Sequence, residues 1–249
     1  HLLQLPEDTA VFLEKDDDLD FVDGKGGKSL ASLKHKAIGD KLTDLSTDFW
    51  KSVNIWLARY KRDGSAASNL QFFLFTTGTV STGSFLSRLR PDKHVGSGDA
   101  ATLTELANAA LAESTSKLIA PIGKKFNELS DPEKQDFLER ILILDGSPRI
   151  GDIPATIRDK HMRSVRREHR EFVFERLEGW WTDAVIKQLA GVGPDGIFGY
   201  EVSDKLSNFA EEYKTDNLPI TFRGKVPADE IDTDGDPRQF VAQLREIGL

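Results

Sequence analysis

Cysteine is absent from the 249 residues, and methionine occurs only once. The lack of cysteine excludes disulfides, thiolate zinc sites and cysteine nucleophiles, and it fits a reducing cytoplasm, where we expect the protein to reside. No apolar run approaches the ~20 residues that cross a bilayer, and the sequence contains no signal-peptide core, so we expect no membrane contact. The net charge of −8 argues against a surface that binds polyanions over its whole extent, although it leaves room for a local basic cleft.

Hydrophobic residues make up 39% of the chain, including 15 Phe and 4 Trp, which is enough for a sizeable core in one large domain or two ordinary ones. The chain begins with His and ends on the apolar string REIGL. We therefore expect it to be part of a longer protein, with further regions before residue 1 and after residue 249.

The first third of the chain predicts an α/β core. Residues 1–5 read as the end of a helix, and the segments 10–14, 18–22 and 28–37 read as strands. Between the second and third strands, DGKGG supplies residues that tolerate positive φ, which favours a hairpin.

A helical pattern follows from residue 44 to about residue 62, and its apolar stripe is Trp50, Val53, Trp56, Leu57 and Tyr60. The next segment, 69–78, is almost continuously apolar, as expected for a strand buried on both faces. The predicted order is therefore αβββαβ. Beyond residue 93 the sequence becomes mostly helical, so we predict a core domain at 1–93 and a helical extension at 94–249.

Five carboxylates are concentrated in FLEKDDDLDF, residues 12–21. The simplest explanation is a solvated acidic turn. Strand alternation, however, directs Asp18 and Asp20 to one face, and it directs Ser32, Lys34 and Lys36 to one face of the next strand. A carboxylate of this kind can hold a divalent metal that polarises a phosphate, while a lysine stabilises the developing charge. Asp18 with Lys34 is therefore a candidate site, and Asp20 is expected to face water.

A structural ion pair is the alternative role for Lys34, because an unpaired ammonium in an apolar strand is costly. Asp18 or Glu14 would be its partner. On this interpretation the pair stabilises the fold and performs no chemistry.

The strings LEKDDDLDF, LASLKHKA, LTDLSTDFWKSVNIW and FFLFTT resemble the N-terminal nuclease-like domain of bacterial anti-phage effectors. These effectors include the endonuclease domain of CBASS proteins and proteins of ABC-three-component systems, and the domain belongs to the PD-(D/E)xK superfamily. The strings ERLEGWW, LPITF and FVAQLREIGL are similar to the latter group. The resemblance implies a restriction-endonuclease-like fold and metal-dependent cleavage of double-stranded DNA.

Transferred position by position, the resemblance implies that Asp18 binds Mg²⁺ or Mn²⁺ with help from Glu14 and Asp17, and that Lys34 is catalytic. Ser32 stands where the family has Gln or Glu, and its neutral hydroxyl is a weaker ligand. The catalytic set implied is thus Asp18, Lys34, Glu14 and Ser32.

Basic residues at four positions are candidates for contact with the DNA backbone, namely Lys36, Lys51, Arg88 and Arg90. A second group, Arg163, Arg166, Arg167 and Arg170, is interleaved with Glu168 and Glu171. For this second group a salt-bridged, solvated helix face is the favoured interpretation, with DNA contact as the alternative.

Two functions follow. The first is a DNA endonuclease effector of low sequence specificity, activated through self-association or rearrangement by a sensor region. The second is a catalytically inactive nuclease-like domain that assembles with partner subunits of a defence complex, which the serine at position 32 favours.

Overall fold

The computed structural model describes residues 5–92 and 100–213. The chain divides into two compact units, His1–Glu211 and Glu212–Leu249. Only the first two residues of the second unit lie within the described ranges. The expected helix end at residues 1–5 lies outside them except for Leu5, and so does the segment LPITF.

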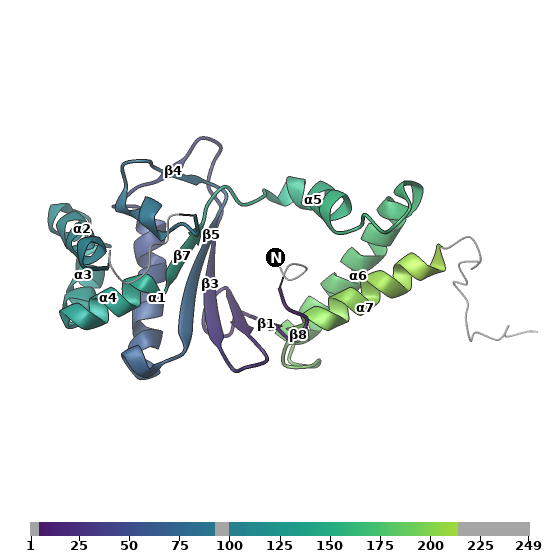
Figure 1. Ribbon diagram of the computed structural model, residues 1–249, viewed down its shortest axis with the longest axis horizontal. Helices are drawn as coiled ribbons and strands as arrows, with labels where there is room; N and C mark the ends of the chain where they lie inside the picture. The colour runs from purple at the N-terminus through teal and green to yellow at the C-terminus, as the bar shows by residue number, and fades with distance from the viewer. Residues whose placement is uncertain (1–4, 93–99, 214–249) are drawn as a thin grey trace, which may run out of the picture. The chain divides into compact units, whose positions relative to one another are not determined.

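A mixed six-stranded sheet forms the centre of the first unit (Figure 1). Its strand order is β7-β5-β3-β2-β1-β8. Strands β3, β5 and β7 run parallel, whereas β2, β1 and β8 each run antiparallel to their neighbour. The strands are β1 (Ala10–Leu13), β2 (Leu19–Val22), β3 (Lys28–Lys34), β5 (Leu70–Thr76), β7 (Ile141–Leu144) and β8 (Ile197–Phe198). A separate pair joins β4 (Lys41–Leu42) and β6 (Thr79–Val80).

The predicted hairpin between the second and third strands is confirmed. Asp23 Oδ1 accepts hydrogen bonds from the backbone N–H groups of Lys25 and Gly27, both at 2.8 Å. Gly26 has a φ of 80°, a conformation that costs glycine little. This turn fixes the register in which Leu19 pairs with Ala31, which places the end of the acidic turn beside the end of β3.

Helix α1 (Thr47–Arg62) packs its apolar stripe on one face of the sheet. All five residues predicted for that stripe are buried. The indole of Trp56 stacks on the ring of Phe72 in β5, with 5.4 Å between ring centroids. The prediction of helix 44–62 is thus confirmed, although the helix begins at Thr47.

The structure has six further α-helices among its described residues, α2 (Ala100–Glu113), α3 (Ala120–Asn127), α4 (Asp131–Glu139), α5 (Ile153–Lys160), α6 (Arg170–Leu189) and α7 (Gly199–Glu212). Short 3₁₀ turns lie at Ser65–Ala67, Phe85–Leu89, Ile150–Asp152 and Arg167–His169. A capping box begins α4, with Glu133 Oε2 accepting from the Ser130 N–H at 2.9 Å. No described helix combines the length and apolar character that a membrane crossing requires.

Residues on both sides of position 93 build the same sheet and core. Strand β7 pairs with β5, and β8 pairs with β1. Phe126, Phe137 and Ile141 belong to the same buried cluster as Trp50. The predicted division into 1–93 and 94–249 therefore does not coincide with an edge of the core.

Strand β5 alternates in burial instead of being buried on both faces. Phe72 and Leu74 face α1 and are fully buried, whereas Phe73 and Phe75 on the other face are only half-buried. The prediction of burial on both faces is therefore wrong, because the second face of the sheet is only partly covered. An apolar run alone does not report how completely its two sides are packed.

Candidate active site

Asp18 and Lys34 form an ion pair beside the end of β3. Lys34 Nζ lies 3.6 Å from Asp18 Oδ2, and the same oxygen accepts a 2.7 Å hydrogen bond from the Leu33 backbone N–H. The side chains are 46% exposed for Asp18 and 22% exposed for Lys34, so water and a ligand can reach the pair. Asp18 Oδ1 has no hydrogen-bond partner within the described part of the chain. The structure thus brings together the two residues on which the predicted chemistry depends.

Asp17 is held by donors of the protein itself. Its carboxylate accepts from Trp56 Nε1 at 2.7 Å and from the Asp18 backbone N–H at 2.9 Å. The Ser32 hydroxyl lies 2.8 and 2.9 Å from the two carboxylate oxygens. Asp17 and Ser32 are both buried. These bonds use the acceptor positions of Asp17 that a metal would need, so Asp17 and Ser32 position the acidic turn.

Glu14 directly follows β1 in a left-handed conformation, with a φ of 51°, which is uncommon for a residue other than glycine. Its backbone N–H donates to the Asp18 carbonyl at 3.2 Å and closes the acidic turn. Its side chain is exposed, and among described residues it makes no hydrogen bond or ion pair. The structure therefore places Glu14 at the turn without bringing its carboxylate to Asp18 or Lys34.

A preformed metal centre is absent from the described ranges 5–92 and 100–213, in which no three His, Cys, Asp or Glu side chains are grouped to hold an ion. Asp18 nevertheless offers one exposed carboxylate oxygen. Mg²⁺ is often held by one or two carboxylates together with water and substrate phosphate. The residues present fit an ion shared with a phosphate ligand, and they do not fit an ion that the protein holds alone.

Asp16 and Asp20, two further carboxylates of the acidic stretch, are engaged by the protein. Asp16 pairs with Arg59 and, at 2.8 Å, with Arg62. The hydrogen bond from Arg59 lowers the pKa of Asp16 most. Asp20 faces α1 and is buried, and its Oδ1 accepts from the Asp17 N–H at 3.2 Å. Burial, followed by the nearby charge of Asp16, raises the pKa of Asp20 to about 6. The prediction of solvation is wrong for Asp20 because α1 covers that face of the sheet.

The four residues predicted to contact DNA lie in different settings. Lys36 pairs with Asp48 of α1, and Arg90 pairs with Asp145 at 3.2 Å. Lys51 is exposed on α1, off its apolar stripe, and Arg88 is exposed in a 3₁₀ turn. Lys36 and Arg90 are thus partly neutralised by carboxylates.

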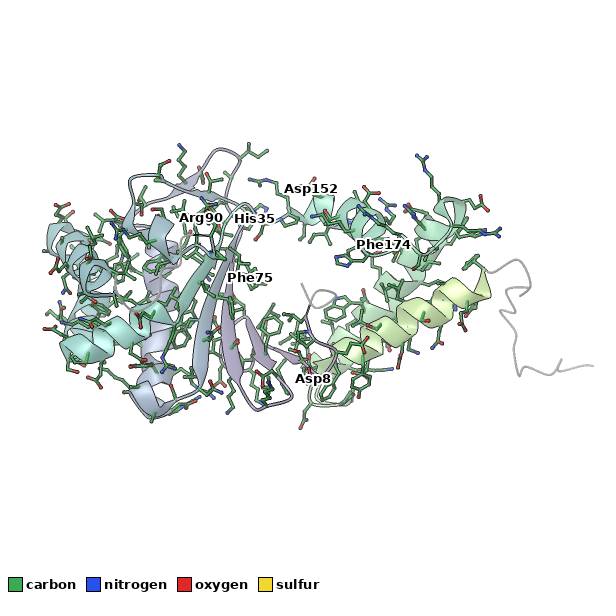
Figure 2. The ribbon with its side chains drawn as sticks, in the orientation of Figure 1. Asp8, His35, Phe75, Arg90, Asp152 and Phe174 are labelled. Atoms are coloured by element: carbon green, nitrogen blue, oxygen red, sulfur yellow. The ribbon has the colours of Figure 1, made fainter. Side chains whose placement is uncertain are left out.

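Sequence reasoning missed a large cavity on the face of the sheet opposite α1. It has a volume of about 980 Å³, and its walls come from the sheet and from α5, α6 and α7. Figure 2 shows Phe75 on the sheet and Phe174 on α6, and both line this cavity. Lys34 also lines it, so the cavity extends to the candidate site. The alternating apolar residues of β1, β2 and β5 were the available signal, because they predict a second apolar face.

No protein-family model and no curated protein matches this chain. Among solved structures, the chain is similar to the Moraxella osloensis Cap4 SAVED/CARF-domain containing receptor, with a TM-score of 0.46 and 13% sequence identity. The match covers 85% of this chain and 44% of that one, so this chain spans less than half of the receptor's length. A likeness this distant does not assign a function.

Proposed function

We propose that this chain is the metal-dependent DNA endonuclease domain of a prokaryotic anti-phage defence protein. The observation that supports the proposal best is the approach of the Lys34 ammonium to the Asp18 carboxylate at the open end of adjacent strands. An exposed pair of this kind, one group able to hold a cation and the other able to stabilise negative charge, suits phosphodiester hydrolysis.

Asp18 would hold Mg²⁺ or Mn²⁺ through its free oxygen, together with the substrate's phosphate. A bound ion supplies positive charge that polarises the phosphate and activates water. The chain's own contribution is to fix Asp18, because the Leu33 N–H and the buried Asp17 hold the turn against the end of β3. Lys34 contributes a protonated ammonium that stabilises the negative charge developing on phosphate oxygens.

The role in defence rests on the resemblance of the strings around Asp18, Lys34 and Trp56 to anti-phage effectors. Such an activity is toxic to its own cell, so we expect cleavage to depend on an activating signal sensed elsewhere in the complete protein. Low sequence specificity is expected, since contacts to the phosphate backbone carry no sequence information directly.

Incubation with plasmid DNA and Mg²⁺ tests the proposal, using the complete activated protein beside Asp18→Asn and Lys34→Ala. Loss of the Lys34 ammonium should slow cleavage by about 100-fold or more, as for other groups that stabilise transition-state charge. Lys28→Ala is the matched control, since Lys28 is an exposed lysine at the opposite end of the same strand. Cleavage that persists unchanged in the Lys34 variant would contradict the proposed site.

A second candidate function, a catalytically inactive assembly domain, is favoured by a specific observation. The carboxylate of Asp17 is saturated by Ser32, Trp56 and Asp18, which leaves Asp18 as the one acid at the ion pair. If wild-type protein leaves DNA intact under all metals tested while it still self-associates or binds partner subunits, this second function replaces the first. Light scattering measures the association independently of cleavage.

A further inference from the structure

The stretch from the end of α5 to the first residue of α6 is strongly basic. Residues 158–170 read RDKHMRSVRREHR, with six Lys or Arg and two Asp or Glu, a net charge of +4 within a chain of net charge −8. Helix α5 ends at Lys160 and α6 begins at Arg170, so three of the six basic residues, Arg163, Arg166 and Arg167, lie outside both α-helices. The helix predicted across 163–170 is therefore wrong, because these residues span a loop and a 3₁₀ turn before α6 begins.

Ion pairs neutralise only part of this charge. Arg158 pairs with Glu171, and Arg170 donates to the Val165 carbonyl at 3.1 Å. Arg163 donates to the Asp159 carbonyl at 2.9 Å, which orders its side chain and leaves its charge in place. Within the described ranges, Lys160, Arg163 and Arg167 have no carboxylate partner, and all three are exposed. These three residues are called the basic strip below.

The basic strip meets the cavity on the open face of the sheet at one of its residues, Lys160. Lys160 lines that cavity, as does Lys34 of the candidate site. His161 also lines the cavity, and its burial is the largest cause of a lowered pKa. One carboxylate in the lining, Asp145, is already paired with Arg90. Exposed Glu178 is the other acidic group of the wall.

Aromatic side chains form part of the cavity wall. Phe75 projects from β5, and Trp180 and Trp181 project from α6, all three half-buried. Binding sites for single-stranded nucleic acid combine a positively charged path for phosphates with aromatic rings on which bases stack. A duplex keeps its base faces stacked inside the helix, so it could not use such rings.

We propose that the basic strip and the aromatic cavity bind a single-stranded segment of nucleic acid. Phosphates lie along Lys160, Arg163 and Arg167, and bases enter the cavity against Phe75 and the tryptophans. The link from this strand to Lys34 rests on the proposed endonuclease function, whereas the binding itself does not. An anionic membrane is disfavoured because these aromatic groups line a cavity and do not form a protruding face.

Fluorescence anisotropy of the full chain in EDTA tests the binding without cleavage. A short labelled oligothymidylate should bind more tightly than a duplex of equal length. An RNA strand of the same length shows whether the site prefers ribose or deoxyribose. The double variant Arg163→Ala/Arg167→Ala should weaken binding of the oligothymidylate by about tenfold. It should also reduce the slope of log K against log salt by about 0.7 for each lost phosphate contact.

Lys117→Ala/Lys124→Ala is the matched control. It removes the same charge from exposed residues in and just before α3, a helix that packs against α1 on the opposite side of the sheet (Figure 1). Its affinity for the oligothymidylate should equal that of the wild type. Equal weakening by both double variants would overturn the proposal, since it would show only an effect of net charge.

Trp180→Ala tests the stacking step and should weaken binding by about 5-fold to 100-fold, while Trp180→Phe retains most of the affinity. Circular dichroism checks that each variant is folded. If Trp180→Ala is not folded, Trp181→Ala takes its place in the stacking test. The proposal is overturned if the duplex binds as tightly as the single strand, or if only anionic phosphatidylserine vesicles bind. If the strand binds tightly but the complete activated protein does not cleave it in Mg²⁺, the endonuclease proposal fails and this one stands.

Discussion

The two faces of the six-stranded sheet differ in how completely they are packed. On the face toward α1, Phe72 and Leu74 are fully buried and pack against Trp56 and the helices of the main core. On the opposite face, Leu33 is 47% exposed and Phe75 borders the cavity. Both faces are apolar in sequence, so the difference arises from what lies over them.

This difference assigns different tasks to the faces. The closed face holds Asp17, Ser32 and Trp56 in one buried network and thereby sets the position of the acidic turn. The open face supplies space, aromatic rings and the approach to Lys34. Rigid support on one side and an accessible cavity on the other are what a binding site on a sheet requires.

Removal of Trp56 should produce the largest effect on stability. Trp56→Ala leaves a cavity in the closed face and removes the bond to Asp17, so the free energy of unfolding should fall by about 3 to 5 kcal/mol. Trp181 lies on the half-buried wall of the open cavity, so Trp181→Ala should lower the free energy of unfolding by less than half as much. Urea denaturation of both variants measures the difference, and equal losses would contradict the comparison.

Titration of Asp20 should make the stability depend on pH in an unusual direction. Because burial on the closed face raises its pKa from 3.8 to about 6, the folded state binds a proton more tightly than the unfolded state does. Stability should therefore fall as the pH rises from about 4 to about 6, by up to about 3 kcal/mol.

Asp20→Asn should remove that fall, which thermal unfolding at several pH values can measure. Asp16 acts in the opposite sense, since its pKa is lowered from 3.8 and its contribution is lost only at more acidic pH. A stability curve for Asp20→Asn that still falls between pH 4 and 6 would show that another group is responsible.

Removal of the Ser32 hydroxyl should have an intermediate effect on stability. Ser32→Ala takes one donor from a buried carboxylate, and hydrogen bonds to charged groups contribute about 1.5 to 3 kcal/mol. Ser32→Thr serves as the conservative control, since it retains a hydroxyl. If Ser32→Ala instead leaves stability unchanged, the network on the closed face does not hold Asp17 as described.

The smallest effect is expected at the exposed edge of the acidic turn. Arg62 is 60% exposed and pairs with Asp16 at 2.8 Å, so Arg62→Ala should cost about 1 kcal/mol or less, and the loss should shrink in high salt. Arg59 is only 12% exposed and pairs with the same carboxylate. Arg59→Ala should therefore cost more, and denaturation at two salt concentrations compares the two variants.

The sequence predicted strands β1, β2, β3 and β5, the first long helix and its buried stripe, because each of these depends on residues near one another in the chain. It also predicted the meeting of Asp18 with Lys34, since the DGKGG turn fixes the register of adjacent strands. These are local consequences of periodicity and turn chemistry. They required no knowledge of the remaining chain.

Contacts between distant segments determined the surroundings of Asp17 and Asp20, the edges of the sheet and the cavity. The indole of Trp56 lies 39 residues beyond Asp17 and occupies its carboxylate, and α1 buries Asp20. Strands β7 and β8 extend the sheet at opposite edges, and α5 and α6 turn its second apolar face into a cavity. A sequence pattern states that a face is apolar, but only the packing of distant helices determines whether that face is closed or open.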